Sequence, residues 1–135
     1  MATTAVPLPP PSEEVEAIVK NALSACIPPE AGFTARKVNE WVDATADACL
    51  RGLAAMGLPY KYAVACTLTQ RTGSGLATAS TAYWDPRRDT SQVMVWENEQ
   101  LQCLVTVHAL CLDIVAATAG MATAADPMAA GGEAK

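Results

Sequence analysis

The sequence has little positive charge and no long apolar run, and each shortage excludes a class of partner. Nine Lys and Arg against fourteen Asp and Glu give a formal net charge of −5. Binding to nucleic-acid phosphates needs a basic stripe, which these scattered cations do not form. No window reaches the ~18 uninterrupted apolar residues of a membrane span, and the first residues lack the basic and apolar regions of a signal peptide. We therefore expect neither nucleic acid nor a membrane as a partner.

The usual elements of an active site are also missing. The single histidine, His108, lies in an apolar stretch, where a lone imidazole is more often a packed sheet residue than a catalyst. The Gly-Ser-Gly at 73–75 lacks the spacing and the following helix of a phosphate-binding loop, so it indicates a turn. Glu97 and Glu99 are typical of solvated turn residues rather than of a paired acid and base. We expect no enzyme activity, no metal site and no cofactor.

The cysteines indicate a reducing compartment. There are five, an odd number, and none forms a C-x-x-C pair. Each falls in an apolar run, where a thiol packs as a small hydrophobic group. They are expected to be buried, unpaired thiols, and the protein is expected in the cytosol. Their positions are Cys26, Cys49, Cys66, Cys103 and Cys111.

Composition divides the chain into three parts. Residues 1–11 contain four prolines and are expected to form a flexible Pro-rich arm. Residues 12–114 have the patterning of one folded domain, whose size leaves little margin of stability without a partner. Residues 115–135 are dominated by Ala and lack apolar bulk, so this C-terminal tail is expected to be largely disordered.

The domain begins with two predicted helices. Ser12 is expected to cap the first helix, which Pro28-Pro29 ends, and Thr34 the second, which ends at Gly57 with Pro59 beyond it. Each helix has an apolar stripe at three- and four-residue spacing. The stripes are Val15, Ile18, Val19, Ala22, Leu23 and Cys26 in the first helix, and Val38, Trp41, Val42, Thr45, Cys49, Leu53 and Met56 in the second.

From Tyr60 onward the apolar period changes from 3.6 to 2, which predicts strands. The first covers 60–70, and a Gly-rich connection leads to a second at 76–84, which Asp85-Pro86 ends. A third strand at 92–96 joins a fourth at 101–112 through a short link at 97–99. The fourth is apolar almost throughout, as suits a central strand, although its length also suits a buried helix. The second strand is unusual because it carries mostly Ala, Thr and Ser.

These stretches resemble a known family. "KYAVACTLTQRTGSGLATASTAYWD", followed by "VMVWENEQLQCLVTVHALCL", is similar to the Tctex-type dynein light chains, with their pattern KY-x-V-x-C, G-x-GL, WD and V-x-WEN. The resemblance covers about residues 14–114, including "IVKNAL" and "KVNEW" in the two helices. The Pro-rich start and the Ala-rich end lie outside it.

The resemblance implies an α+β fold in which two N-terminal helices pack on a four-stranded antiparallel sheet. It also implies a strand-swapped dimer, in which each subunit donates its second strand to the other's sheet. A donated strand lies far from its own helices, so it needs backbone partners and small side chains more than it needs a hydrophobic core within its own subunit. That requirement accounts for the composition of 76–84.

The implied function is that of a non-catalytic accessory light chain of a dynein motor, on microtubules in the cytoplasm or in a ciliary or flagellar axoneme. Its partners would be the dynein intermediate chain, added as a further β-strand, and a second copy or a related light chain. The alternative is a dynein-independent peptide-binding adaptor of the same fold. The expected dimer and partner-binding residues are Leu76, Ala77, Thr78, Ala79, Ser80, Thr81, Ala82, Tyr83 and Trp84.

Overall fold

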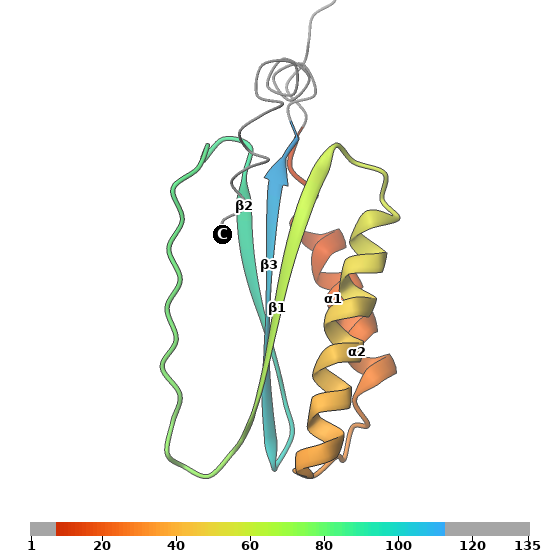
Figure 1. The fold of residues 1–135 in the computed structure, drawn as a ribbon, viewed down its shortest axis with the longest axis vertical. Coiled ribbons are helices and arrows are strands. Elements are labelled where there is room, and N and C mark those ends of the chain that lie inside the picture. Colours follow the sequence, from red (N-terminus) through yellow and green to blue (C-terminus); the bar gives the residue numbers. More distant parts are fainter. Residues whose placement is uncertain (1–7, 113–135) are drawn as a thin grey trace, which may run out of the picture.

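Two helices cover one face of a three-stranded antiparallel sheet in the computed structural model, which describes residues 8–112 (Figure 1). The sheet order is β1-β3-β2. The C-terminal tail, and all but the last four residues of the expected N-terminal arm, lie outside the described residues. The elements are α1 (Ser12–Cys26), α2 (Ala35–Ala54), β1 (Tyr60–Gln70), β2 (Thr90–Glu97) and β3 (Leu101–Cys111).

Helix α1 forms where the first apolar stripe predicts it, but its N-terminus differs from the expectation. Pro11 is the N-cap, with φ −60° and ψ 134°, and its carbonyl accepts hydrogen bonds from Glu14 N and Val15 N. Ser12 is already helical and makes no side-chain capping bond. The fixed φ of proline sets the chain direction just before the helix, which removes the need for a hydroxyl cap. Pro10 is buried, so the end of the Pro-rich stretch packs on the domain.

Helix α2 buries Thr45, Cys49 and Leu53 against the sheet, as its stripe predicts. Thr34 occupies the N-cap position but makes no side-chain hydrogen bond. The helix ends at Ala54, and Gly57 two residues beyond the cap adopts a φ of +69°, a conformation that favours glycine. Trp41 lies half-buried against the core.

Strand β3 is central and supplies most of the core on the sheet side. Its residues alternate, with those facing the helices exposed by 2% or less and those between them half-buried. The prediction of a central strand, rather than a buried helix, is confirmed. The buried positions are Leu101, Cys103, Val105, Val107 and Ala109.

Strands β1 and β2 flank β3 in antiparallel registers. β1 pairs from Tyr60 opposite Cys111 to Gln70 opposite Leu101, and its bounds match the predicted strand at 60–70. β2 pairs from Thr90 opposite Ala109 to Glu97 opposite Gln102. The helices lie on one face only, so the other face of the sheet, called here the outer face, carries no helix (Figure 1).

The expected fourth strand is not part of this sheet. Residues 76–84 form no strand in the described chain, which therefore has three strands rather than four. β1 ends at one end of the sheet and β2 begins at the other, so the connection between them has to run the full length of the sheet (Figure 1). No strand among residues 8–112 pairs with this connection.

Candidate functional site

The connection between β1 and β2 is the most exposed part of the described chain. Residues 72–84, called here the connecting segment, run along the sheet on the side away from the helices (Figure 1). Every residue from 72 to 83 is exposed, with Tyr83 at 104% and Leu76 at 47%. Gly73 and Gly75 have φ of +86° and +82°, so the segment leaves β1 through two conformations that favour glycine. Ser74 N–H donates to Thr72 Oγ1 at 3.4 Å, and residues 75–84 make no backbone–backbone hydrogen bond within the described chain, so their backbone groups are available to a partner.

Arg71 holds the chain immediately before the connecting segment. Its backbone N–H donates to Gln100 O at 2.7 Å, and its Nη1 donates to Asn98 O at 2.6 Å. The same guanidinium lies 3.6 Å from a carboxylate oxygen of Glu97. One residue is thus tied by backbone and side chain to the turn between β2 and β3, and this tie fixes where the connecting segment starts.

Asp89 holds the chain at the other end of the connecting segment. One carboxylate oxygen accepts the N–H of Cys111 at 2.7 Å, and the other accepts the N–H of Asp85 at 3.0 Å. The Tyr60 hydroxyl donates to Arg88 O at 2.9 Å, which ties the same turn to the start of β1. Residues 85–89 therefore form a compact turn fastened to the end of the sheet.

The two anchors require an extended conformation between them. At roughly 3.3 Å per residue, β1 spans about 36 Å and the thirteen residues of the connecting segment span at most about 43 Å. The segment has to cover the length of the sheet with little slack. Trp84, its last residue, is half-buried because its ring meets His108 edge to face, with centroids 6.0 Å apart.

The outer face of the sheet presents uncovered apolar side chains. Val93 and Val95 of β2 are 55% and 56% exposed, and Leu104 of β3, which is half-buried, lies opposite Val95. His108 lies on this face, and its Nδ1 is buried without a hydrogen-bond partner among the described residues. A contiguous apolar surface of this kind is typical of a protein–protein interface.

All nine residues expected at the site lie together in the connecting segment. Only Trp84 makes a ring contact, and the other eight project into solvent. The anchoring residues Arg71 and Asp89 were not expected at the site. In the sequence, these two residues are marked only as charged residues near the ends of the strand-like segment. That position indicates no role until their hydrogen-bond partners are known.

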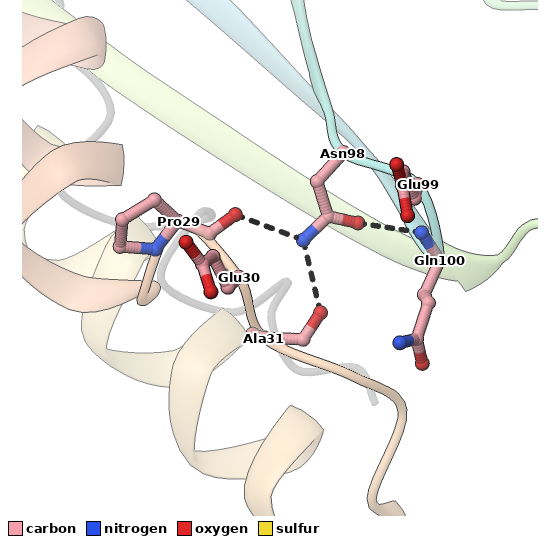
Figure 2. A pocket seen from close by; sticks show the side chains of 6 residues that line it. All are labelled: Pro29, Glu30, Ala31, Asn98, Glu99 and Gln100. Carbon is pink, nitrogen blue, oxygen red and sulfur yellow. Dashed lines mark hydrogen bonds between the residues drawn. The ribbon is translucent and has the colours of Figure 1, made fainter.

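Asn98 was also missed, because the sequence shows only a polar turn between two strands. Its Nδ2 donates to the carbonyls of Pro29 at 3.2 Å and Ala31 at 2.9 Å, as Figure 2 shows. Its Oδ1 accepts the N–H groups of Gln100 at 2.8 Å and Leu101 at 2.7 Å. The side chain thus joins the loop between the helices to the β2–β3 turn, beside a pocket of roughly 460 Å³.

All five thiols are free, as expected, but their burial is only partly as expected, because Cys26, Cys66 and Cys111 are half-buried. Cys49 and Cys103 are fully buried, and Cys66 lies with its Sγ 3.5 Å from that of Cys103. Burial raises the pKa of Cys49 to about 11, and the hydrogen bond with Cys103 together with burial raises that of Cys66. Both therefore stay protonated near neutral pH, which makes them poor nucleophiles.

Residues 8–112 contain no group of three or more His, Cys, Asp or Glu placed to hold a metal ion. Neither helix in that range is long and apolar enough to cross a membrane. The candidate site therefore consists of an exposed extended segment, two sheet edges that pair with no further strand in residues 8–112, and an apolar outer face.

Comparison with known proteins agrees with these features. The sequence model of the Tctex-1 family matches residues 9–110. A dynein light chain Tctex-type of Drosophila melanogaster is 35% identical over 100 residues, which cover 74% of this chain and 89% of the relative. Human dynein light chain Tctex-type 3 is 31% identical over 101 residues, 75% of this chain and 86% of the relative. A Tctex-type light chain of Dictyostelium discoideum is 31% identical over 96 residues, 70% and 86% of the two chains. With this match over most of its described residues, the chain belongs to the Tctex-1 family.

Proposed function

We propose that this chain is a non-catalytic accessory light chain of a dynein motor, which dimerises by exchanging its connecting segments and binds an intermediate chain by strand addition. The observation that carries the proposal is the exposed connecting segment, held extended between Arg71 and Asp89. Membership of a family whose relatives are named dynein light chains supports the motor assignment. A segment that is already extended loses little further backbone entropy when it enters another sheet.

The β1 edge of a second copy is the best fit for the connecting segment. β1 has eleven residues, close to the length of the segment, whereas β2 has eight. The outward residues of β1 include Ala63 and Ala65, and small neighbours of this kind match the Ala, Thr and Ser of residues 77–82. Exchange between two copies would give each a four-stranded sheet, as the resemblance implied.

The outer faces of the two sheets would meet in the same dimer. Val93 and Val95 are more than half exposed in the single chain, and association would remove them from water. A face-to-face arrangement also suits the path of the connecting segment, which lies on the outer side of its own sheet (Figure 1). Dimerisation would therefore bury the apolar outer face and, at the same time, pair the connecting segment with a strand of the second copy.

The intermediate chain would then add beside the exchanged segment. Strand addition gives about five or six backbone hydrogen bonds, each worth about 1 kcal/mol net, against the loss of freedom of a flexible peptide. Affinity on the order of micromolar is expected for one site. A dimer offers two sites, and a paired intermediate chain would gain avidity without any new contact.

Proline substitution in the connecting segment tests the exchange. Thr78→Pro and Ser80→Pro remove backbone donors from an exposed stretch, whereas Thr78→Ala keeps them. Light scattering at micromolar concentration should give about twice the chain mass for the parent and for Thr78→Ala, and monomer for the proline variants. A folded monomeric parent protein would contradict the exchange.

Calorimetric titration tests the partner. An intermediate-chain peptide should bind the parent dimer and lose affinity in Thr81→Pro if that variant stays dimeric. Unchanged affinity would place the peptide elsewhere on the molecule. Co-sedimentation with microtubules and release by ATP, together with intermediate and heavy chains, would support the motor assignment, and a chain that never co-purifies with them would favour the motor-independent adaptor.

A further inference from the structure

A groove lies along the second free edge of the sheet, between α1 and β2. Glu16, Lys20, Leu23 and Ser24 line it from the helix, and residues 93–96 line it from the strand. Its volume is roughly 450 Å³. At one end of the groove, the Gln92 side chain donates to Ser12 O at 3.1 Å, and this hydrogen bond ties the helix to the strand.

The strand that borders this groove has none of the usual protection of a sheet edge. β2 pairs with β3 on one side and with no other strand in the described residues. From Thr90 to Trp96 it contains no charged residue, no proline and no glycine. Natural sheet edges are normally protected by lysine, proline or a bulge, because an unprotected edge can pair with a strand of another chain. The seven residues from Thr90 to Trp96 lack these protective features, so this edge suits the addition of another strand.

Apolar side chains border the edge on both faces. Met94 and Trp96 are half-buried on the helix side above Leu23, which is 3% exposed. Val93 and Val95 lie on the outer face, where they are more than half exposed in the single chain and would face the partner's sheet in the proposed dimer. An added strand alternates its side chains between the two faces, so apolar residues of either parity would meet apolar neighbours.

Charges at the two ends of the edge are acidic on balance. The turn before β2 carries Arg87 and Arg88, but Asp85 and Asp89 stand in the same turn, and Arg88 pairs with Asp85 at 3.1 Å. The first turn of α1 carries Glu13 and Glu14, and Glu16 follows, while Lys20 is the only cation of that helix and pairs with Glu16 at 3.0 Å. The turn after β2 carries exposed Glu99. Acidic groups at both ends of an uncharged edge favour a ligand that is apolar in the middle and basic at its ends.

We propose that the β2 edge is a second docking site, which binds an extended segment of a partner protein with an apolar or Thr-rich centre and Lys or Arg flanks. The site is separate from the proposed β1-edge exchange and from peptide addition to the connecting segment, because β3 lies between the two edges. One dimer would then bind two kinds of extended partner at once.

A pair of tryptophan substitutions tests the groove. Ser24 is exposed and lines it, whereas its exposed neighbour Ala25 does not. Ser24→Trp should fill the groove, and Ala25→Trp adds the same side chain to the same helix outside it. The probe is the peptide Lys-Lys-Val-Thr-Val-Thr-Val-Thr-Lys-Lys, with a second peptide carrying Glu at the four flanking positions.

Fluorescence anisotropy should show the basic peptide binding the parent and Ala25→Trp within twofold of each other. Binding should be at least tenfold weaker in Ser24→Trp and for the acidic peptide, and should weaken with salt. Amide chemical shifts should change at residues 93–96 and not at 76–84. Thr81→Pro should leave this binding unchanged, which separates it from the proposed intermediate-chain site.

Four results would overturn the proposal. The first is equal binding by the two tryptophan variants, and the second is equal binding of the two peptides. The third is a set of shift changes confined to residues 76–84, which would place the peptide at the connecting segment. The fourth is evidence that the edge is already occupied. A tenfold rise in affinity on removal of residues 1–7 would identify those residues as the occupant. A lower particle mass for Ser24→Trp, but not for Ala25→Trp, would identify a second copy of the chain as the occupant.

Discussion

Replacing Asn98 by Asp should destabilise the domain strongly, although the two side chains have the same shape. The amide Nδ2 faces two carbonyl oxygens, of Pro29 at 3.2 Å and of Ala31 at 2.9 Å. A carboxylate would place a negatively charged oxygen against both carbonyls. The bonds that Oδ1 accepts from Gln100 and Leu101 would remain.

The magnitude follows from the bonds that are lost. Two hydrogen bonds of about 0.5–1.5 kcal/mol each are removed, and repulsion between like partial charges adds to the loss. We expect the free energy of unfolding to fall by about 2–4 kcal/mol, a large part of the roughly 5–15 kcal/mol of an ordinary domain. For a domain of this size the melting temperature should fall by roughly 10–20 °C.

Urea and thermal unfolding at fixed protomer concentration would measure the change, since dimerisation makes apparent stability concentration-dependent. Glu99→Gln is the matched control, because Glu99 is exposed in the same turn and its change is the reverse one. That control should stay within about 0.5 kcal/mol of the parent. If Asn98→Asp also stays within this margin, Asn98 does not hold the helix loop to the sheet.

Further predictions concern the titrating groups and the second anchor. Burial raises the pKa of Cys49 from 9.0 to about 11 and that of Tyr60 from 10.0 to about 12. Both protons are held more tightly in the folded state, so the contribution of these two groups to the free energy of unfolding should be constant below about pH 8.5 and should be lost between about pH 9 and 12; a flat urea-unfolding profile between pH 9 and 12 would contradict their burial. Cys66 and Cys103 should react with a thiol reagent slowly in the native protein and rapidly in denaturant, and fast native labelling would show that they are accessible. Asp89→Ala removes both acceptor oxygens, so hydrogen exchange at the Cys111 and Asp85 amides should accelerate; unchanged exchange at both would refute the anchor.

The strands and helices with strong periodic patterns were predictable because their burial is one-sided. β1 matches its predicted bounds of 60–70, and its alternation from Tyr60 fixes which face is buried, because a shift of one residue would turn Lys61 toward the core. β3 was predictable as the central strand because apolar residues occupy both of its faces. The helix starts were less accurate, because a capping hydroxyl at Ser12 competes with the fixed geometry of Pro11, and only the packed structure shows which one acts.

The sequence marked the connecting segment by its composition, but it did not reveal the residues that hold the segment in place. The Ala, Thr and Ser of residues 77–82 marked a segment with nothing to bury, and the structure places that segment in solvent. Arg71, Asp89 and Asn98 could not be found in the same way. Each acts through backbone groups of residues 22 to 69 positions away, and backbone groups leave no trace in residue type.

The sequence by itself determined the two helices and three of the strands, because hydrophobic periodicity is a local property that one-sided burial imposes on each element. The tertiary structure alone decided that within residues 8–112 both edges of the sheet lack a paired strand, that β2 begins at the far end of the sheet from the end of β1, and that the segment between them is held extended at both ends. Those features depend on which strands pair and on where distant backbone groups meet. Pairing is a long-range choice among many similar partners, so it is fixed only when the whole sheet and its helices pack together.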